Sequence, residues 1–499
     1  MGPIHDELGL EQGGVNSDRV YKLCNNNQLK TAQRSELGVK VGPAVVSAIG
    51  QADDTSLLSD SLSKLAGLVH LAEEYCSAFH VTLVPEKTKL LSYSPASYDN
   101  FLSEILNPIK VAGLKIPFSP SAEHVGILRT AEGGNMLHLL GRVSAHRRAV
   151  ASILFTGMAK GHRGSPVAGL RLERLYGAPV LLSGVAALVL STAELSILHL
   201  HYKKSLRQLL RLPVNTPESF VMLAAGSLPL TALLHLRMLG LLGMIARLGQ
   251  GSILNKIGRH MLLTAQNRQS WFIQMRSVTQ KYALPDPLLI LQQEPSKGSW
   301  KLQCRRAVLD WWQTQYRGEA AGLSSLANFR HNFSSLTTPH KIITSARTPY
   351  EVSRATTALV MLSGRYITDY RTRHWDRGNP NGNCRLCPSP PNMQAPLGDL
   401  AHQLLLCNAL QPARLRSVQL WAEYMATRPY LFAVVKHYTL GSLEDSLAFL
   451  LEPTSCPLVI NLAQEQGQYI IDELCYMTRV WVHGNHVLRL NLLRYYGFL

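Results

Sequence analysis

The stretch Val45-Val46-Ser47-Ala48-Ile49-Gly50-Gln51-Ala52-Asp53-Asp54-Thr55 joins a β-branched run to two adjacent carboxylates. The apolar run predicts a strand that enters a turn, and Leu57-Leu58 restores the apolar character after it. Adjacent carboxylates repel each other, so they persist where a turn exposes them or where a divalent cation neutralises them. By itself, the Asp-Asp pair favours a solvated turn over a metal site.

The chain around this stretch changes from a mixed to a helical pattern. Residues 62–79 have the periodicity of a helix, and residues 80–84 indicate a strand that Pro85 stops. The α+β pattern ends near Arg129, and residues 135–350 show mostly helical patterns. Helix starts are predicted at Thr216-Pro217-Glu218 and at Pro229, and linkers at 285–299 and 377–396. We therefore expect three segments: α+β at 1–130, mostly α-helical at 131–350, and a small helical domain at 351–499.

The charge of the 499-residue chain is concentrated in its middle. The chain has 50 Lys and Arg against 33 Asp and Glu, a net charge of +17. Residues 101–350 hold 29 basic and 10 acidic residues, a net +19, while residues 1–100 are net −4 and residues 351–499 net +2. A basic block beside an acidic one indicates a polyanion partner near a carboxylate site, although a solvated surface gives the same composition.

The composition excludes several classes of protein. Hydrophobic residues make up 46% of the chain, which excludes a disordered or collagenous protein. Eight Cys are too few for a disulfide scaffold, and the N-terminus lacks an apolar core of signal-peptide length. We expect an intracellular protein, nuclear or cytoplasmic and not secreted. No membrane span is expected, because the apolar stretch 178–198 contains Glu194 and indicates a buried helix.

The surroundings of the Asp-Asp pair resemble those in the reverse transcriptase of LINE-type (non-long-terminal-repeat) retrotransposons. Gln51-Ala52-Asp53-Asp54 resembles the aromatic-Ala-Asp-Asp box of that family, with Gln51 in place of the aromatic residue. Upstream, residues 9–18 resemble its Gly-x-x-Gln-Gly loop and helix, and the matching residues are Gly9, Gln12, Gly13 and Ser17. Gly14, Val15 and Asp18 depart from the family pattern. The resemblance implies that the matching residues shape a template and nucleotide pocket.

Two further boxes follow in the order of the family. Residues 83–89 resemble its Leu-Asn-x-x-Lys-Thr segment, with Lys87 and Thr88 matching and Val84 in place of Asn. Residues 123–127 resemble the primer-grip turn, where Gly126 matches. The resemblance implies a partial polymerase palm at 1–130 followed by a helical thumb and connector.

The resemblance also implies a reaction, RNA-directed DNA synthesis with Mg²⁺. In such a palm Asp53 is a metal ligand, Asp54 its less direct neighbour, and Lys87 protonates or steadies the leaving pyrophosphate. The family has another metal-binding Asp upstream of the Gly-x-x-Gln-Gly loop, and Asp6 lies too close to that loop to be its equivalent. We therefore expect this chain to resemble the C-terminal portion of the enzyme, with an incomplete active site when alone.

A second cluster suits a different metal. Cys384, Cys387, His402 and Cys407 have the spacing C-x2-C-x14-H-x4-C. Two thiolates two residues apart grip one tetrahedral ion, and the His and the last Cys supply the other two ligands. Three thiolates and an imidazole leave no open position, so the spacing predicts a structural Zn²⁺. LINE-type elements carry a similar cluster after the polymerase, which adds to the resemblance.

Two basic clusters at helical spacing are candidates for contact with a phosphate backbone. The first contains Arg142, His146, Arg147 and Arg148, and the second Lys203, Lys204, Arg207 and Arg211. The partners expected are RNA and DNA, and the oligomeric state stays open. Two functions remain: part of a reverse transcriptase, or a non-catalytic, zinc-containing protein that binds nucleic acid.

Overall fold

The computed structural model describes residues 17–51, 54–93, 108–117, 119–155, 164–264, 270–387 and 395–498, with the backbone alone for residues 17–24. The chain divides into two compact units. Unit 1 contains residues 1–142, 182–195 and 234–307, and unit 2 contains residues 143–181, 196–233 and 308–499. Most described residues lie in helices, and the strands form four small antiparallel pairs.

The elements of the N-terminal region are short strands and two helices: α1 (Ser17–Arg34), β1 (Val39–Val41), β2 (Ala44–Val46), β3 (Ala48–Gln51), β4 (Asp54–Leu57), α2 (Leu62–Ala78), η1 (Pro85–Lys87), β5 (Lys110–Val111), β6 (Leu114–Lys115), β7 (Ser121–His124) and β8 (Ile127–Thr130). Helix α2 confirms the prediction for residues 62–79, and it buries Leu68 and Ala72 on its predicted apolar face. A small core of Ile109, Val111 and Ile116 packs against the same helix.

The predicted strand at 45–50 is divided at Ser47. β2 pairs with β1, whereas β3 pairs with β4, so two hairpins replace one strand. Ser47 is fully buried between them. The Gln33 side chain of α1 causes the break, since it donates to the Val45 carbonyl and accepts the Ser47 N–H.

The predicted strand at 80–84 is wrong. His80 has a φ of 56°, which turns the chain at the end of α2, and no strand forms over these residues. Val81 and Val84 are exposed, so the β-branched residues lack the sheet neighbour that a strand needs.

The helical region follows: α4 (Met136–Ile153), α5 (Pro166–Leu172), η3 (Glu173–Gly177), α6 (Ala178–Leu181), η4 (Val185–Ala187), α7 (Thr192–Leu209), α8 (Glu218–Ala225), α9 (Leu230–Arg247), α10 (Ile253–Thr264), α11 (Trp271–Lys281), α12 (Pro287–Gln293), α13 (Lys297–Gly322), η5 (Ser324–Leu326), η6 (His331–Phe333) and α14 (Lys341–Thr344). Residues 285–299 are therefore largely helical, and the predicted linker there is wrong. Its Pro residues begin or precede helices instead of separating domains, as with Pro287 in the first turn of α12.

The apolar stretch 178–198 is buried in part but is not one helix. Helix α6 ends at Leu181, Gly184 adopts a φ of 74° before η4, and α7 begins only at Thr192. In the described part of the chain, α9 is long and apolar enough to cross a membrane by length and composition, and half of its residues are buried within the protein. A core helix of a soluble protein meets the same criterion.

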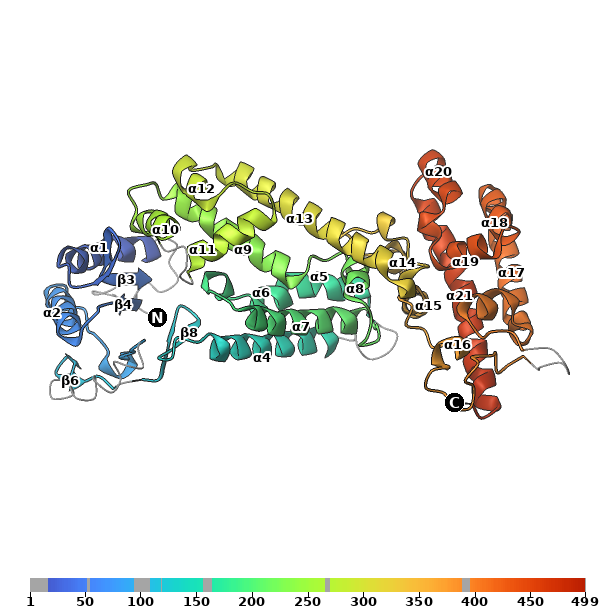
Figure 1. The fold of residues 1–499 in the computed structure, drawn as a ribbon, viewed down its shortest axis with the longest axis horizontal. Helices are drawn as coiled ribbons and strands as arrows, with labels where there is room; N and C mark the ends of the chain where they lie inside the picture. The colour runs from blue at the N-terminus through green and yellow to red at the C-terminus, as the bar shows by residue number, and fades with distance from the viewer. Residues whose placement is uncertain are drawn as a thin grey trace, which may run out of the picture. The chain divides into compact units, whose positions relative to one another are not determined.

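The C-terminal part of unit 2 is arranged around one long helix. Its elements are α15 (Pro349–Leu362), α16 (Asp369–Thr372), η7 (His402–Leu406), η8 (Asn408–Leu410), α17 (Gln411–Ala426), η9 (Pro429–Leu431), α18 (Phe432–Thr439), α19 (Leu443–Leu451), η10 (Pro453–Ser455), α20 (Pro457–Gln466) and α21 (Tyr469–Tyr495). Helices α15, α17, α19 and α20 all pack against α21, as Figure 1 shows in the orange and red part of the chain. The core helix α21 thus organises the domain that contains the Cys/His cluster.

Candidate metal centre and nucleic-acid surface

The four predicted ligands Cys384, Cys387, His402 and Cys407 lie together, with all their ligand atoms within 4.8 Å of one another. The Cys407 Sγ lies 3.8 Å from the Cys384 Sγ and 3.6 Å from the Cys387 Sγ. The Cys387 Sγ lies 3.4 Å from the His402 Nε2. Two sulfurs that share a Zn²⁺ at ~2.3 Å in a tetrahedron are about 3.8 Å apart. The group can therefore hold a metal ion such as Zn²⁺.

The backbone around the cluster fixes the direction of each ligand. The Leu386 N–H donates to the Cys384 sulfur and the Asn408 N–H to the Cys387 sulfur. The Cys384 N–H donates to the Pro396 carbonyl, which closes the loop across the cluster. The Asp399 carboxylate accepts the His402 N–H at 2.7 Å and so positions the turn that carries the imidazole.

The cluster favours the ionised form of one thiol, Cys407. The hydrogen bond with Cys407, together with burial, raises the pKa of Cys384, and burial, together with the hydrogen bond with Cys407, raises that of Cys387. The hydrogen bond from Cys384, with those from His402 and Cys387, lowers the pKa of the Cys407 thiol to about 4, against the effect of burial. Three thiolates and a neutral imidazole around a divalent ion carry a net charge of −1. Arg414 of α17 supplies a compensating charge, because its guanidinium interacts with Cys407 and Cys387. The sequence pattern of the ligands gave no sign of this arginine.

The metal cluster is anchored on α21. Cys384, Cys407 and Leu410 form a buried core, and Leu488 and Leu492 of α21 pack against it. All four positions of a tetrahedral ion would be filled by side chains, so the site suits a structural role and leaves no place for a reactive water. An ion bound there would hold Cys384 and Cys387 to His402 and Cys407 beside the long helix.

The residues predicted for the polymerase site are described only in part. Gly9, Gln12, Gly13 and Asp53 lie outside the described residues, and Ser17 is the first residue of α1. Gln51 and Asp54 are cross-strand partners at the tip of the β3–β4 hairpin, and both are exposed. Lys87 ends η1 and is also exposed. The hairpin that the Asp-Asp stretch predicted is therefore present, with Asp54 open to solvent.

The first basic cluster, on α4, is divided between exposed and buried positions. Arg147 and Arg148 of α4 are exposed. His146 is buried and its Nε2 lies 2.8 Å from the Glu173 carboxylate, so it belongs to the core and not to a basic face. Arg142, the remaining member, is half-buried on the same helix.

The second basic cluster lies on α7. Lys203 pairs with Glu218 at 2.9 Å, and the Arg207 guanidinium donates to the Thr216 carbonyl, so both contribute to packing. Lys204 is exposed. Burial lowers the pKa of His201, and the charges of Arg147, His146 and Lys204 lower it further. Arg147 of α4 and Lys204 of α7 therefore act on the same histidine and belong to one basic region.

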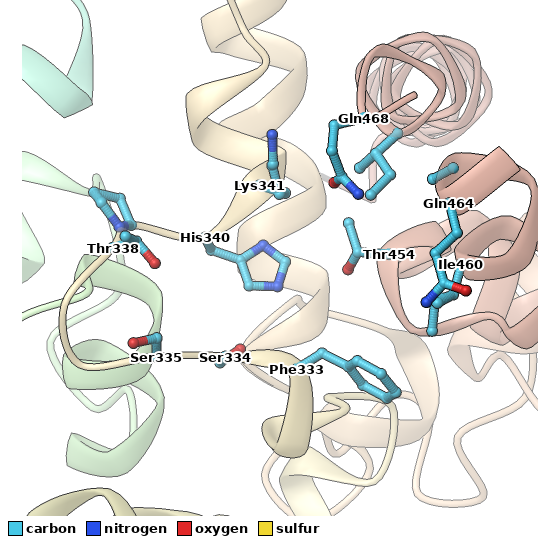
Figure 2. Close-up of a pocket in the computed structure, with 13 residues that line it drawn as sticks. Phe333, Ser334, Ser335, Thr338, His340, Lys341, Thr454, Ile460, Gln464 and Gln468 are labelled. Atoms are coloured by element: carbon cyan, nitrogen blue, oxygen red, sulfur yellow. The ribbon is translucent and has the colours of Figure 1, made fainter. Parts of the chain in front are cut away.

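A cavity of about 280 Å³ in unit 2 has His340 on its wall. Figure 2 shows the imidazole directed toward Thr454. Its Nε2 lies 2.9 Å from the fully buried Glu452 carboxylate, and its Nδ1 accepts the Ile342 N–H at 3.3 Å. Both ring nitrogens have partners, so His340 holds α14 in place and is not a free base.

The remaining Cys and His candidates have packing roles where they are described. Cys76, Cys304, Cys456 and Cys475 are buried free thiols, and the side chain of Cys24 lies outside the described residues. His483 and His486 of α21 are half-buried. The Nδ1 of His483 lies 3.1 Å from the Thr357 hydroxyl, and the Nδ1 of His486 lies 2.9 Å from the Tyr366 hydroxyl.

Comparison with models of protein families gave no match, and no curated protein matched the sequence.

Proposed function

We propose that this chain is part of the reverse transcriptase of a LINE-type retrotransposon and that it binds RNA and DNA. The observation that carries the proposal is the Cys/His cluster, whose four ligand atoms lie within 4.8 Å of one another. In the sequence, this cluster follows the β3–β4 hairpin. A Zn²⁺ cluster after an Asp-Asp hairpin is the order that the family resemblance implies. We assign the cluster to Zn²⁺ because three thiolates and one imidazole suit its tetrahedral geometry.

The polymerase part of the proposal rests on the hairpin. Bound Mg²⁺ would supply activation of a primer hydroxyl and neutralise the leaving pyrophosphate. Asp54 is exposed at the start of β4, and Asp53 precedes it in the sequence. Lys87 is an exposed cation suited to steady the pyrophosphate. Gly9, Gln12, Gly13, Ser17 and Gln51 are the candidates for the template and nucleotide pocket.

The nucleic-acid surface of the proposal lies on α4 and α7. Arg147, Arg148 and Lys204 are exposed cations, whereas Lys203 and Arg207 are held by partners inside unit 2. The charges of Arg147 and Lys204 both lower the pKa of His201, which supports a concentrated positive potential around this histidine. A phosphate backbone is the polyanion that such a region attracts without reading the base sequence.

A binding assay tests this proposal. Affinity for a labelled single strand should fall roughly 100-fold between about 50 and 200 mM salt if four to six phosphates are contacted. The triple variant Arg147→Glu, Arg148→Glu, Lys204→Glu should weaken binding to all sequences alike. Lys436→Glu, an exposed cation on α18, is the matched control and should bind as the wild type does. An unchanged affinity in the triple variant would exclude this surface.

The second candidate is a chain that binds nucleic acid without polymerising it. Asp54 belongs to no group of three or more potential metal ligands within the part of the chain that the structure describes. Primer extension on poly(rA)/oligo(dT) with Mg²⁺ tests the polymerase role directly. Synthesis that Asp53→Ala abolishes supports the polymerase, and synthesis that survives this substitution contradicts the role of Asp53.

A further inference from the structure

The surface next to the metal cluster carries exposed aromatic side chains that the proposed function has not used. Trp375 is 67% exposed, Tyr496 59% and Phe498 42%. Tyr370 and Tyr495 are exposed as well, and we call these five residues the aromatic surface. Large aromatic groups usually lie in the interior of a protein, and a group of them at the surface indicates an interaction site.

Two segments far apart in the sequence form this surface, and Arg385 joins them. Its guanidinium pairs with Asp376, the neighbour of Trp375, and lies 5.5 Å from the centre of the Phe498 ring. The rings of Tyr495 and Tyr496 lie 5.1 Å apart, and those of Tyr496 and Phe498 lie 6.4 Å apart. Arg385 belongs to the metal-binding loop, so the Cys/His cluster positions the link between the segments.

The charge around the rings is positive. The Arg373 guanidinium stacks over the Tyr370 ring at 3.7 Å, and Arg377 and Arg494 are exposed. Two acidic residues of this region pair with cations, Asp369 with Arg489 and Asp376 with Arg385. A partner for the aromatic surface therefore has flat apolar faces and negative charge together, which describes nucleotides.

We propose that the aromatic surface stacks on the unpaired bases of single-stranded nucleic acid. This inference rests on the proposed nucleic-acid function and adds that the nucleic acid bound here is single-stranded. Bases in a duplex have their faces covered by their neighbours, so only unpaired bases offer a face to Trp375 or Phe498. Stacking tolerates any base, and the arginines neutralise the adjoining phosphates.

The test compares a fluorescein-labelled oligo(dT) strand with a hairpin duplex, using the zinc-loaded full chain. Trp375→Ala should lower the affinity for the single strand about tenfold, the effect of one lost stacked base, and leave duplex affinity unchanged. Trp375→Phe should retain most of the affinity, because phenyl also stacks. Phe498→Ala gives a second, independent variant, and Phe432→Ala, an exposed aromatic on α18, is the control. Zinc content and circular dichroism establish that each variant is folded.

The outcomes separate the two proposals. Salt-dependent binding by the wild type with unchanged single-strand affinity in both Trp375→Ala and Phe498→Ala overturns the stacking inference and leaves the proposed function standing. An equal loss for single strand and duplex also overturns it, since stacking predicts a selective loss. A wild type that binds neither ligand overturns both.

Discussion

Asp369 and Arg489 form an ion pair at 3.5 Å with only 7% and 6% of their side chains exposed. Asp369 also accepts the N–H of Arg385 in the metal-binding loop, and Arg489 donates to the Ile367 carbonyl. The pair therefore joins the loop of the metal cluster to α21 through charged hydrogen bonds. Removal of one partner from a buried pair leaves the other charge without compensation.

The first prediction concerns this pair. Asp369→Asn should lower the free energy of unfolding of unit 2 by about 3–5 kcal/mol, because Arg489 stays buried without a counter-charge. Urea unfolding followed by circular dichroism measures the change. The control is Asp60→Asn, which removes the exposed pair with Lys64 on the surface of α2 and should cost no more than about 0.5 kcal/mol. Equal costs for the two variants would contradict the structural role of the buried pair.

The second prediction concerns the metal. Purified protein should contain a single Zn²⁺ per chain, and Cys387→Ser should lose it together with stability on the order of several kcal/mol, since metal binding is coupled to folding. Metal analysis and thermal unfolding measure the two effects. Cys76→Ser alters a buried thiol outside the cluster and should keep the metal. A wild type purified without chelator that contains far less zinc than protein would refute the assignment.

The Cys/His cluster was predictable because the identity and spacing of its four residues lie within one short stretch of sequence. Helix α2 was predictable for a similar reason, since its apolar periodicity is local. The division of the strand at Ser47 was not, because the cause is the side chain of Gln33 on a different element. Local apolar patterns cannot indicate which backbone groups a distant side chain will bind.

The same limit applies to the basic clusters. Helical spacing placed Lys203, Lys204 and Arg207 together, yet only the structure separates exposed Lys204 from the others, whose partners Glu218 and Thr216 lie beyond the helix. Arg414 was missed entirely, since no ligand spacing involves it. Charge counts predict that a region is basic, and tertiary contacts decide which cations remain available to a ligand.

The third prediction is a pH dependence of the stability of unit 1. Burial, with the charge of Lys281, lowers the pKa of His235 to about 4, and its Nδ1 lies 2.7 Å from the Tyr282 hydroxyl. The unfolded histidine has a pKa of about 6.5, so between these values the unfolded state binds more protons. The contribution of His235 to the free energy of unfolding should therefore be fully present above about pH 6.5. The free energy of unfolding should then fall by about 2–3 kcal/mol as the pH decreases to about 4.

Denaturant unfolding across this pH range, in the wild type and in His235→Gln, measures the contribution. The variant should lose that part of the acid sensitivity, whereas His70→Gln, an exposed histidine on α2, should retain it. An identical pH dependence in His235→Gln and the wild type would show that His235 is not the titrating group.

The last prediction concerns Glu218, which joins three helices of unit 2. Its carboxylate accepts hydrogen bonds from His199 at 2.8 Å, Lys203 at 2.9 Å and the Tyr316 hydroxyl at 2.6 Å. Burial by itself would raise the pKa of Glu218, but these three donors hold it well below its usual range. Glu218→Gln should therefore destabilise the protein by about 2–3 kcal/mol near neutral pH, since charge-assisted hydrogen bonds are lost and Lys203 loses its counter-ion.

Because the folded pKa is lowered, the contribution of Glu218 is present above its unfolded pKa of about 4.3 and declines as the pH falls below it. The difference between wild type and Glu218→Gln in urea should shrink from neutral pH toward strongly acidic pH. Glu465→Gln, an exposed carboxylate on α20, supplies the control. A constant difference at all pH values would mean that the substitution acts through packing and not through the charge of Glu218.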